Sequence, residues 1–185
     1  MMSTTEFKIK QTNIPGLLEI DISLIQDNRG WFQEKFQREK LVALGFPEEF
    51  NVVQHSLSYN KQPGVTRGFH AEPWDKYISV VSGKIFAAFV DLRKENFGKK
   101  FTITVDNTKA VFVPKGVANS FQVLEADTYY TYLVNDHWSQ NNLSKYKFVN
   151  LADETLVIDW PIPLNEAVIS QRDQKHPKLS EISPF

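Results

Sequence analysis

Between about residues 50 and 135 the chain is a series of short runs rich in β-branched and aromatic residues, separated by breaks that contain Pro, Gly, Asn or Asp. Such runs are typical of strands, and such breaks are typical of turns. The runs recur about every ten residues, which predicts an all-β sandwich or barrel. The eight expected strands are residues 51–59, 64–70, 76–81, 84–92, 101–105, 110–114, 119–124 and 128–134.

The segments outside this region add little regular structure. Residues 17–22 ("LLEIDI") and 31–36 ("WFQEKF") are expected to be two more strands. Residues 38–46 favour one or two turns of helix, with Gly45 near the end. Prolines exclude a long helix after residue 150. We expect one domain over residues 1–185, because the length suits a single domain and no repeat or linker interrupts the chain.

Composition excludes several classes of protein. Lys and Arg number 21 against 22 Asp and Glu, so a chain whose main partner is a nucleic acid is not expected. No stretch approaches the roughly 20 apolar residues that span a bilayer, and we expect no membrane partner. The chain has no cysteine, which excludes thiol catalysis and disulfides and suits a cytoplasmic location.

The stretch "RGFHAEPWDK", residues 67–76, concentrates ionisable side chains between two expected strands. Because side chains alternate between the two faces of a strand, we expect Gly68 and His70 on one face and Arg67 and Phe69 on the other. A histidine here is either a satisfied structural residue at the mouth of the barrel or a catalytic group. The spacing alone leaves both interpretations open.

Metal binding has poor support in the sequence. Small β-barrels can carry a histidine-rich metal site with ligands from two strands. Here only His70 and Glu72 have ligand-like spacing, and Asn119 stands on a later strand where a third imidazole would be wanted. We therefore expect no metal and no other cofactor.

Acid–base chemistry without a metal needs a base, a carboxylate that orients it, a cation for developing negative charge and a proton donor. His70, Asp173, Lys76 and His137 are candidates for these four roles, although most Lys and Asp are ordinary surface charges. Glycine-rich phosphate loops are absent from the sequence. A phosphate would therefore be bound by arginine side chains, for which Arg29 and Arg67 are the candidates.

Five segments of the chain, in their order along it, resemble the dTDP-4-dehydrorhamnose 3,5-epimerase family. They are "DNRGWFQEKF", "GVTRGFH", "GKIFAAFVDLRK", "FVPKGVANSFQVL" and "VIDWP". The segment "HAEPWDKYISV" resembles the subgroup in which the lysine follows the histidine at short spacing. The resemblance implies a metal-free, cupin-type jelly roll with a few short peripheral helices. It also implies a homodimer that shares an N-terminal strand.

The resemblance further implies roles for individual residues. His70 would remove a proton next to the C4 ketone of a nucleotide-linked 4-keto-6-deoxyhexose, Asp173 would orient His70, and Lys76 would stabilise the enolate. The positions that match or adjoin ligand-contacting positions of the family are Arg29, Glu34, Gln54, Ser56, Arg67, Asn119, Trp138 and Arg172. Asn119 replaces a family histidine, as it does in the short-spacing subgroup, and Ser56 replaces a family asparagine.

The chain departs from the family at the proton donor. A gapless comparison from "GVANSF" onward places His137 where the family has its catalytic tyrosine, so we expect that tyrosine to be missing. His137 could be the acid itself, or it could indicate an enzyme that epimerises one carbon or uses another nucleotide sugar. A non-catalytic nucleotide-sugar-binding jelly roll is the alternative from another class. Because base, orienting carboxylate and cation are all present, we favour an epimerase.

Overall fold

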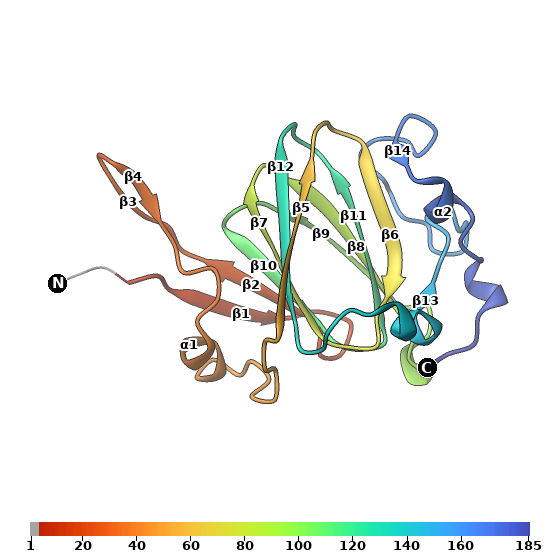
Figure 1. Ribbon diagram of the computed structural model, residues 1–185, viewed down its shortest axis with the longest axis horizontal. Coiled ribbons are helices and arrows are strands. Elements are labelled where there is room, and N and C mark those ends of the chain that lie inside the picture. The colour runs from red at the N-terminus through yellow and green to blue at the C-terminus, as the bar shows by residue number, and fades with distance from the viewer. Residues whose placement is uncertain (1–3) are drawn as a thin grey trace.

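A computed structural model describes residues 4–185 and contains two large sheets that face one another (Figure 1). The first sheet has the strand order β1 (Phe7–Gln11), β2 (Leu18–Ile22), β10 (Lys109–Val113), β7 (Lys76–Ser82), β12 (Thr128–Val134) and β5 (Gln54–Asn60). The second has the order β13 (Lys147–Phe148), β6 (Val65–Ala71), β11 (Val117–Val123), β8 (Ile85–Asp91) and β9 (Lys100–Val105), with β14 (Val168–Ile169) parallel to β6. This is the expected jelly roll.

All eight strands expected between residues 50 and 135 are confirmed as β5 to β12, with ends shifted by a few residues. Apolar side chains from both sheets meet between them, among them Ile78 of β7, Val111 of β10, Phe89 of β8 and Val123 of β11. Each of these four side chains has at most 1% of its surface exposed. The main core therefore lies between the sheets, as hydrophobic burial of the inward-facing positions requires.

The short helices lie at the periphery, as expected. They are α1 (Arg38–Val42), α2 (Gln171–Gln174) and the 3-10 turns η1 (Lys94–Asn96), η2 (Gln140–Lys145) and η3 (Leu179–Glu181). The side chain of Gln37 caps α1 by accepting a hydrogen bond from the Lys40 amide at 2.7 Å. Gly45, at φ +93°, lets the chain turn just after the helix. No helix within residues 4–185 is long and apolar enough to cross a membrane.

A two-stranded hairpin, β3 (Ile25–Asp27) and β4 (Gly30–Phe32), projects away from the sheets near the N-terminus (Figure 1). The strand expected over residues 31–36 is therefore wrong beyond Phe32. The chain leaves the hairpin there because Phe36 packs edge to face against Phe46 and Tyr77 in an aromatic cluster. The hairpin leaves Trp31 50% exposed and Phe32 61% exposed.

Strand β6 contains a bulge at the "RGFH" motif. Arg67 pairs with Phe121 of β11, and His70 pairs with Asn119. The two β6 residues are three positions apart, but their partners on β11 are only two apart, so β6 contains one extra residue. Gly68, at φ +125°, lies in the bulge, and a Cβ there would be 2.7 Å from the Cα of Ser120, so only glycine allows this approach. The extra residue places Arg67 on the same side as His70. The expectation that they occupy opposite faces is wrong for this reason.

Candidate active site

Two neighbouring cavities share part of their lining. The larger is about 580 Å³ and is lined from β6, β12, β13, β14, η2 and α2. The smaller is about 200 Å³, lies between the sheets, and adds Lys76 and Asn119 to the wall. Both cavities are lined by Arg67, His70, Glu72 and Tyr132. Four ionisable residues of the "RGFHAEPWDK" stretch, Arg67, His70, Glu72 and Lys76, therefore meet in one hollow, whereas Asp75 lines neither cavity.

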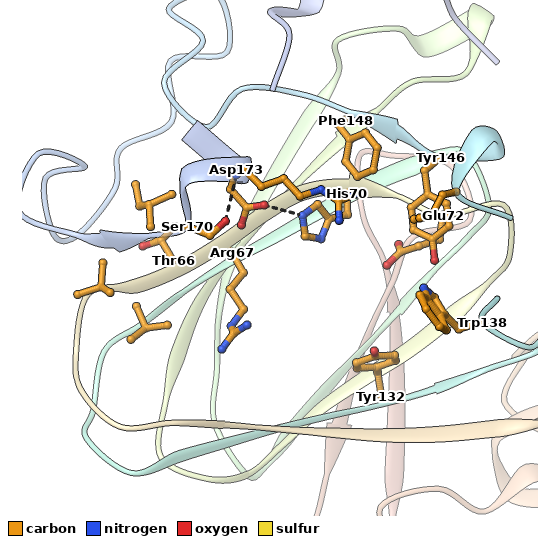
Figure 2. A pocket seen from close by; sticks show the side chains of 15 residues that line it. Thr66, Arg67, His70, Glu72, Tyr132, Trp138, Tyr146, Phe148, Ser170 and Asp173 are labelled. Atoms are coloured by element: carbon orange, nitrogen blue, oxygen red, sulfur yellow. Dashed lines mark hydrogen bonds and ion pairs between the residues drawn. The ribbon is translucent and has the colours of Figure 1, made fainter. Parts of the chain in front are cut away.

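His70 is paired with Asp173, which lies 103 residues further along the chain. Their Nε2 and Oδ1 atoms are 3.1 Å apart (Figure 2). Asp173 belongs to α2, whose N-cap Ser170 accepts a hydrogen bond from the Asp173 amide at 3.1 Å. The amide of Gly68 donates to the second carboxylate oxygen at 3.3 Å. The carboxylate is thus fixed from two sides, and it orients the imidazole.

The electrostatics of Asp173 favour its ionised form. Burial on its own raises the pKa of this carboxyl group, but the hydrogen bond from His70, its charge and the bond from Gly68 outweigh burial and hold the pKa below its ordinary value. A carboxylate that stays ionised can stabilise an imidazolium beside it. The pair is therefore equipped to accept a proton on the other ring nitrogen of His70.

Lys76, at the start of β7, is an almost buried cation in the inner cavity. It forms an ion pair with Glu72, and their side chains are 6% and 12% exposed. Asn119 bridges the two: its amide donates to Glu72 at 2.9 Å and its oxygen is 3.4 Å from Nζ of Lys76. Nζ also lies 4.8 Å from the centre of the Tyr132 ring. The sequence indicated Lys76 and Asn119, but it gave Glu72 no role in this network.

Tyrosines line the cavity, although we expected the catalytic tyrosine to be missing. Tyr132 comes from β12 and Tyr146 follows η2, and Figure 2 shows both beside the hollow that contains His70. Burial, followed by the charge of Glu72, raises the pKa of Tyr146, so this phenol keeps its proton. The sequence did carry a signal for Tyr132. Tyr132 is two residues after the buried Tyr130 on β12, and side chains two apart on a strand point to the same face, so alternation predicts that Tyr132 points inward.

His137 lies outside the set of residues that line either cavity, and its side chain is exposed. Its neighbour Trp138 does line the larger cavity (Figure 2). The Trp138 amide donates to Gln54 at 3.0 Å, and Gln54 donates to Ser56 at 3.1 Å. These three residues, which the sequence singled out for binding, are therefore connected along the edge of β5.

The candidate phosphate ligands fall into two groups. Arg67 and Arg172 line the larger cavity, the first donating to Asn60 at 3.2 Å and the second lying 5.1 Å from the centre of the Phe148 ring. Arg29 lies instead on the projecting hairpin, where it pairs with Asp27 and is 85% exposed. Glu34 follows that hairpin and forms an ion pair with Lys40. Neither Arg29 nor Glu34 lines either cavity of its own chain.

A jelly roll whose cavity combines a histidine–carboxylate pair with a buried lysine defines a cupin-type protein equipped for proton abstraction. The family model described as dTDP-4-dehydrorhamnose 3,5-epimerase matches residues 11–181. The chain belongs to this family of isomerases.

Several relatives resemble the chain over most of its length. A curated protein of Streptococcus pyogenes serotype M6, named "Protein RmlC homolog", is 51% identical over 93% of this chain and 89% of its own. The structure of RmlC from Streptococcus suis in complex with dTDP-D-xylose is 48% identical, with a TM-score of 0.92 over 97% of this chain and 94% of that one. RmlC from Legionella pneumophila in complex with dTDP-4-keto-L-rhamnose is 29% identical, with a TM-score of 0.85 over 96% and 95% of the two chains.

Proposed function

We propose that the protein epimerises a dTDP-4-keto-6-deoxyhexose by removing a proton from a carbon next to the C4 ketone, in the formation of dTDP-rhamnose. The observation that carries this proposal is the His70–Asp173 pair in the same hollow as Lys76. Binding alone needs no orienting carboxylate behind a histidine. Relatives named as epimerases and solved with dTDP-sugars support the nucleotide and the sugar.

The first step is proton abstraction by His70. With Nε2 bonded to Asp173, the other ring nitrogen, Nδ1, takes the proton from the carbon, and the electron pair of the C–H bond moves onto the ketone oxygen. A carbon acid beside a ketone is weak, so the enolate needs a fixed positive charge. Lys76 supplies that charge from a nearly buried position, where it is only weakly screened by water.

The second step returns a proton to the opposite face of the carbon, which inverts it. Tyr132 is our candidate donor, because β12 belongs to the sheet that faces the one carrying His70. A substrate between the sheets would therefore have His70 on one side and Tyr132 on the other. His137 remains the alternative donor, and it would have to turn inward from its exposed position.

Binding of the diphosphate is assigned to arginines. Arg67 and Arg172 are supplied by the chain that forms the cavity. For Arg29 and Glu34 we propose that they reach the cavity of a second copy. The hairpin that carries Arg29 projects from its own sheets and exposes Trp31 and Phe32, which is typical of a surface that another chain covers. The proposed functional unit is accordingly a homodimer, and we place it in the cytoplasm.

The test is hydrogen exchange during turnover. The protein is incubated with dTDP-4-keto-6-deoxyglucose in deuterated water, and deuterium at carbons 3 and 5 is measured by mass spectrometry. Incorporation at both carbons supports a 3,5-epimerase, and incorporation at one supports a single-carbon enzyme. Binding of the nucleotide sugar without any incorporation would contradict the proposal and favour a non-catalytic binding protein.

A further inference from the structure

A second histidine lies directly behind the His70–Asp173 pair and takes no part in the proposed reaction. His176 follows α2, and its side chain is 6% exposed. Its ring stacks on Phe148, with centroids 4.7 Å apart at an angle of 30°. Its position in the sequence gives no sign of this placement, because only the fold brings His176 next to His70.

Both ring nitrogens of His176 lack a hydrogen bond of normal geometry to the protein. Leaving a buried polar group unpaired is unfavourable, so such a group is expected to have a partner. An imidazole nitrogen without a protein partner is available as a ligand for a transition-metal ion.

The donor atoms of three side chains converge at this place. Oδ1 of Asp173 is 3.1 Å from Nε2 of His70 and 3.6 Å from Nε2 of His176. The ligand atoms of all three residues lie within 4.8 Å of one another. Four-coordinate zinc with bonds of about 2.0–2.1 Å has ligand atoms roughly 3.3 Å apart, so the donor atoms must approach one another by up to about 1.5 Å to complete the set.

We propose that His70, Asp173 and His176 form a binding site for one divalent transition-metal ion, of which Zn²⁺ is the representative. Two imidazoles and one carboxylate are a donor set that zinc uses in proteins. The larger cavity is lined by His70 and Asp173, which gives the ion a path of entry and leaves its fourth position for water.

Metal binding and catalysis exclude each other at this site. When zinc binds, Nε2 of His70 releases its proton and bonds to the metal in place of the Asp173 carboxylate, while Nδ1 takes up a proton, so that the imidazole stays neutral. A metal-bound imidazole cannot become the imidazolium that proton abstraction produces. The ion therefore acts as a reversible inhibitor, not as a cofactor.

The test is isothermal titration of the metal-free full-length protein with ZnCl₂. Wild-type protein is expected to bind one Zn²⁺ per chain, and His176→Gln is expected to weaken binding by at least about 10-fold. His55→Gln is the matched control and is expected to bind as the wild type does, because His55 lies on β5 and contacts Thr131. His70→Gln removes a ligand from another element, so misfolding of one variant does not leave the site untested.

The proposal is overturned if wild-type protein binds no stoichiometric zinc, or if His176→Gln and His70→Gln both bind it as tightly as wild type. Inhibition is measured separately, as loss of deuterium exchange on adding zinc and recovery on adding a chelator. That second readout rests on the proposed function, whereas the titration does not. If the protein binds no zinc but catalyses deuterium exchange, only the metal site is contradicted. If it binds zinc tightly but catalyses no exchange even when metal-free, only the epimerase assignment is contradicted.

Discussion

Glu72 and Lys76 form an ion pair that is almost completely enclosed by the two sheets. Removing two charges from water is costly, and their attraction offsets this cost only while both are present and hydrogen-bonded. Asn119 provides hydrogen bonds to both partners. The lysine that we assign to the enolate is therefore held in place by Glu72, whose position along the chain does not indicate this role.

The first prediction concerns this pair. Glu72→Gln should lower the free energy of unfolding by about 3–5 kcal/mol, because it leaves Lys76 as a buried charge without its counter-charge. The double variant Glu72→Gln/Lys76→Met should lose less than the sum of the single losses, by at least about 1 kcal/mol. Urea unfolding of the four proteins measures this coupling. Additive losses would show that the pair contributes no net coupling.

The strands and the short helix were predictable because they depend on local patterns. β-branched runs, turn residues and the glycine after α1 sufficed for β5 to β12 and for α1. The bulge at Gly68 was not predictable, because it depends on the close approach of Ser120 from another strand. Strict alternation therefore placed Arg67 on the wrong face.

The site was predictable in part, and only through resemblance to a family. Nothing local to "SQRDQ" indicates that Asp173 meets His70, since the contact spans 103 residues. Glu72 and His176 were left without a role because their positions depend on packing between elements. Tyr132, our candidate donor, was not singled out because a gapless comparison placed His137 at the donor position, although alternation along β12 points Tyr132 inward.

The second prediction identifies the proton donor. Tyr132→Phe should retain deuterium exchange at the first carbon but lose net epimerisation, because His70 still removes the proton and nothing returns one to the opposite face. His137→Phe should retain deuterium exchange and net epimerisation, since the side chain of His137 is exposed. Product analysis by NMR alongside mass measurement separates the two outcomes. If His137→Phe lost net epimerisation and Tyr132→Phe retained it, His137 would be the donor and Tyr132 would only line the cavity.

The third prediction tests whether the site is shared between two chains. His70→Asn and Arg29→Ala should each be nearly inactive as homodimers. When the two proteins are mixed and allowed to exchange subunits, activity should return, because one cavity then combines an intact His70 with an intact Arg29 from the other chain. No recovery in mixtures shown to contain heterodimers would mean that Arg29 serves its own chain or has no part in binding.

The fourth prediction is a pH dependence of stability. Burial lowers the pKa of Lys35 to about 8, from an ordinary value of 10.5. Between these values the unfolded state binds more protons than the folded state, so the contribution of Lys35 to stability rises with pH across this window. The stability of wild type relative to Lys35→Met should increase by about 3 kcal/mol from pH 7.5 to pH 10.5. A constant difference over this range would show that Lys35 is not desolvated.

The most direct test of the account is the rate of deuterium incorporation by His70→Asn. Loss of a general base typically costs about 10²–10⁴ in rate, so less than about 1% of the wild-type exchange rate is expected at every carbon. Nucleotide-sugar binding, measured by calorimetry on the same protein, should change little. His55→Asn is the matched control and should exchange at the wild-type rate. If His70→Asn kept more than about a tenth of the wild-type rate, the base would lie elsewhere and the proposed mechanism would be contradicted.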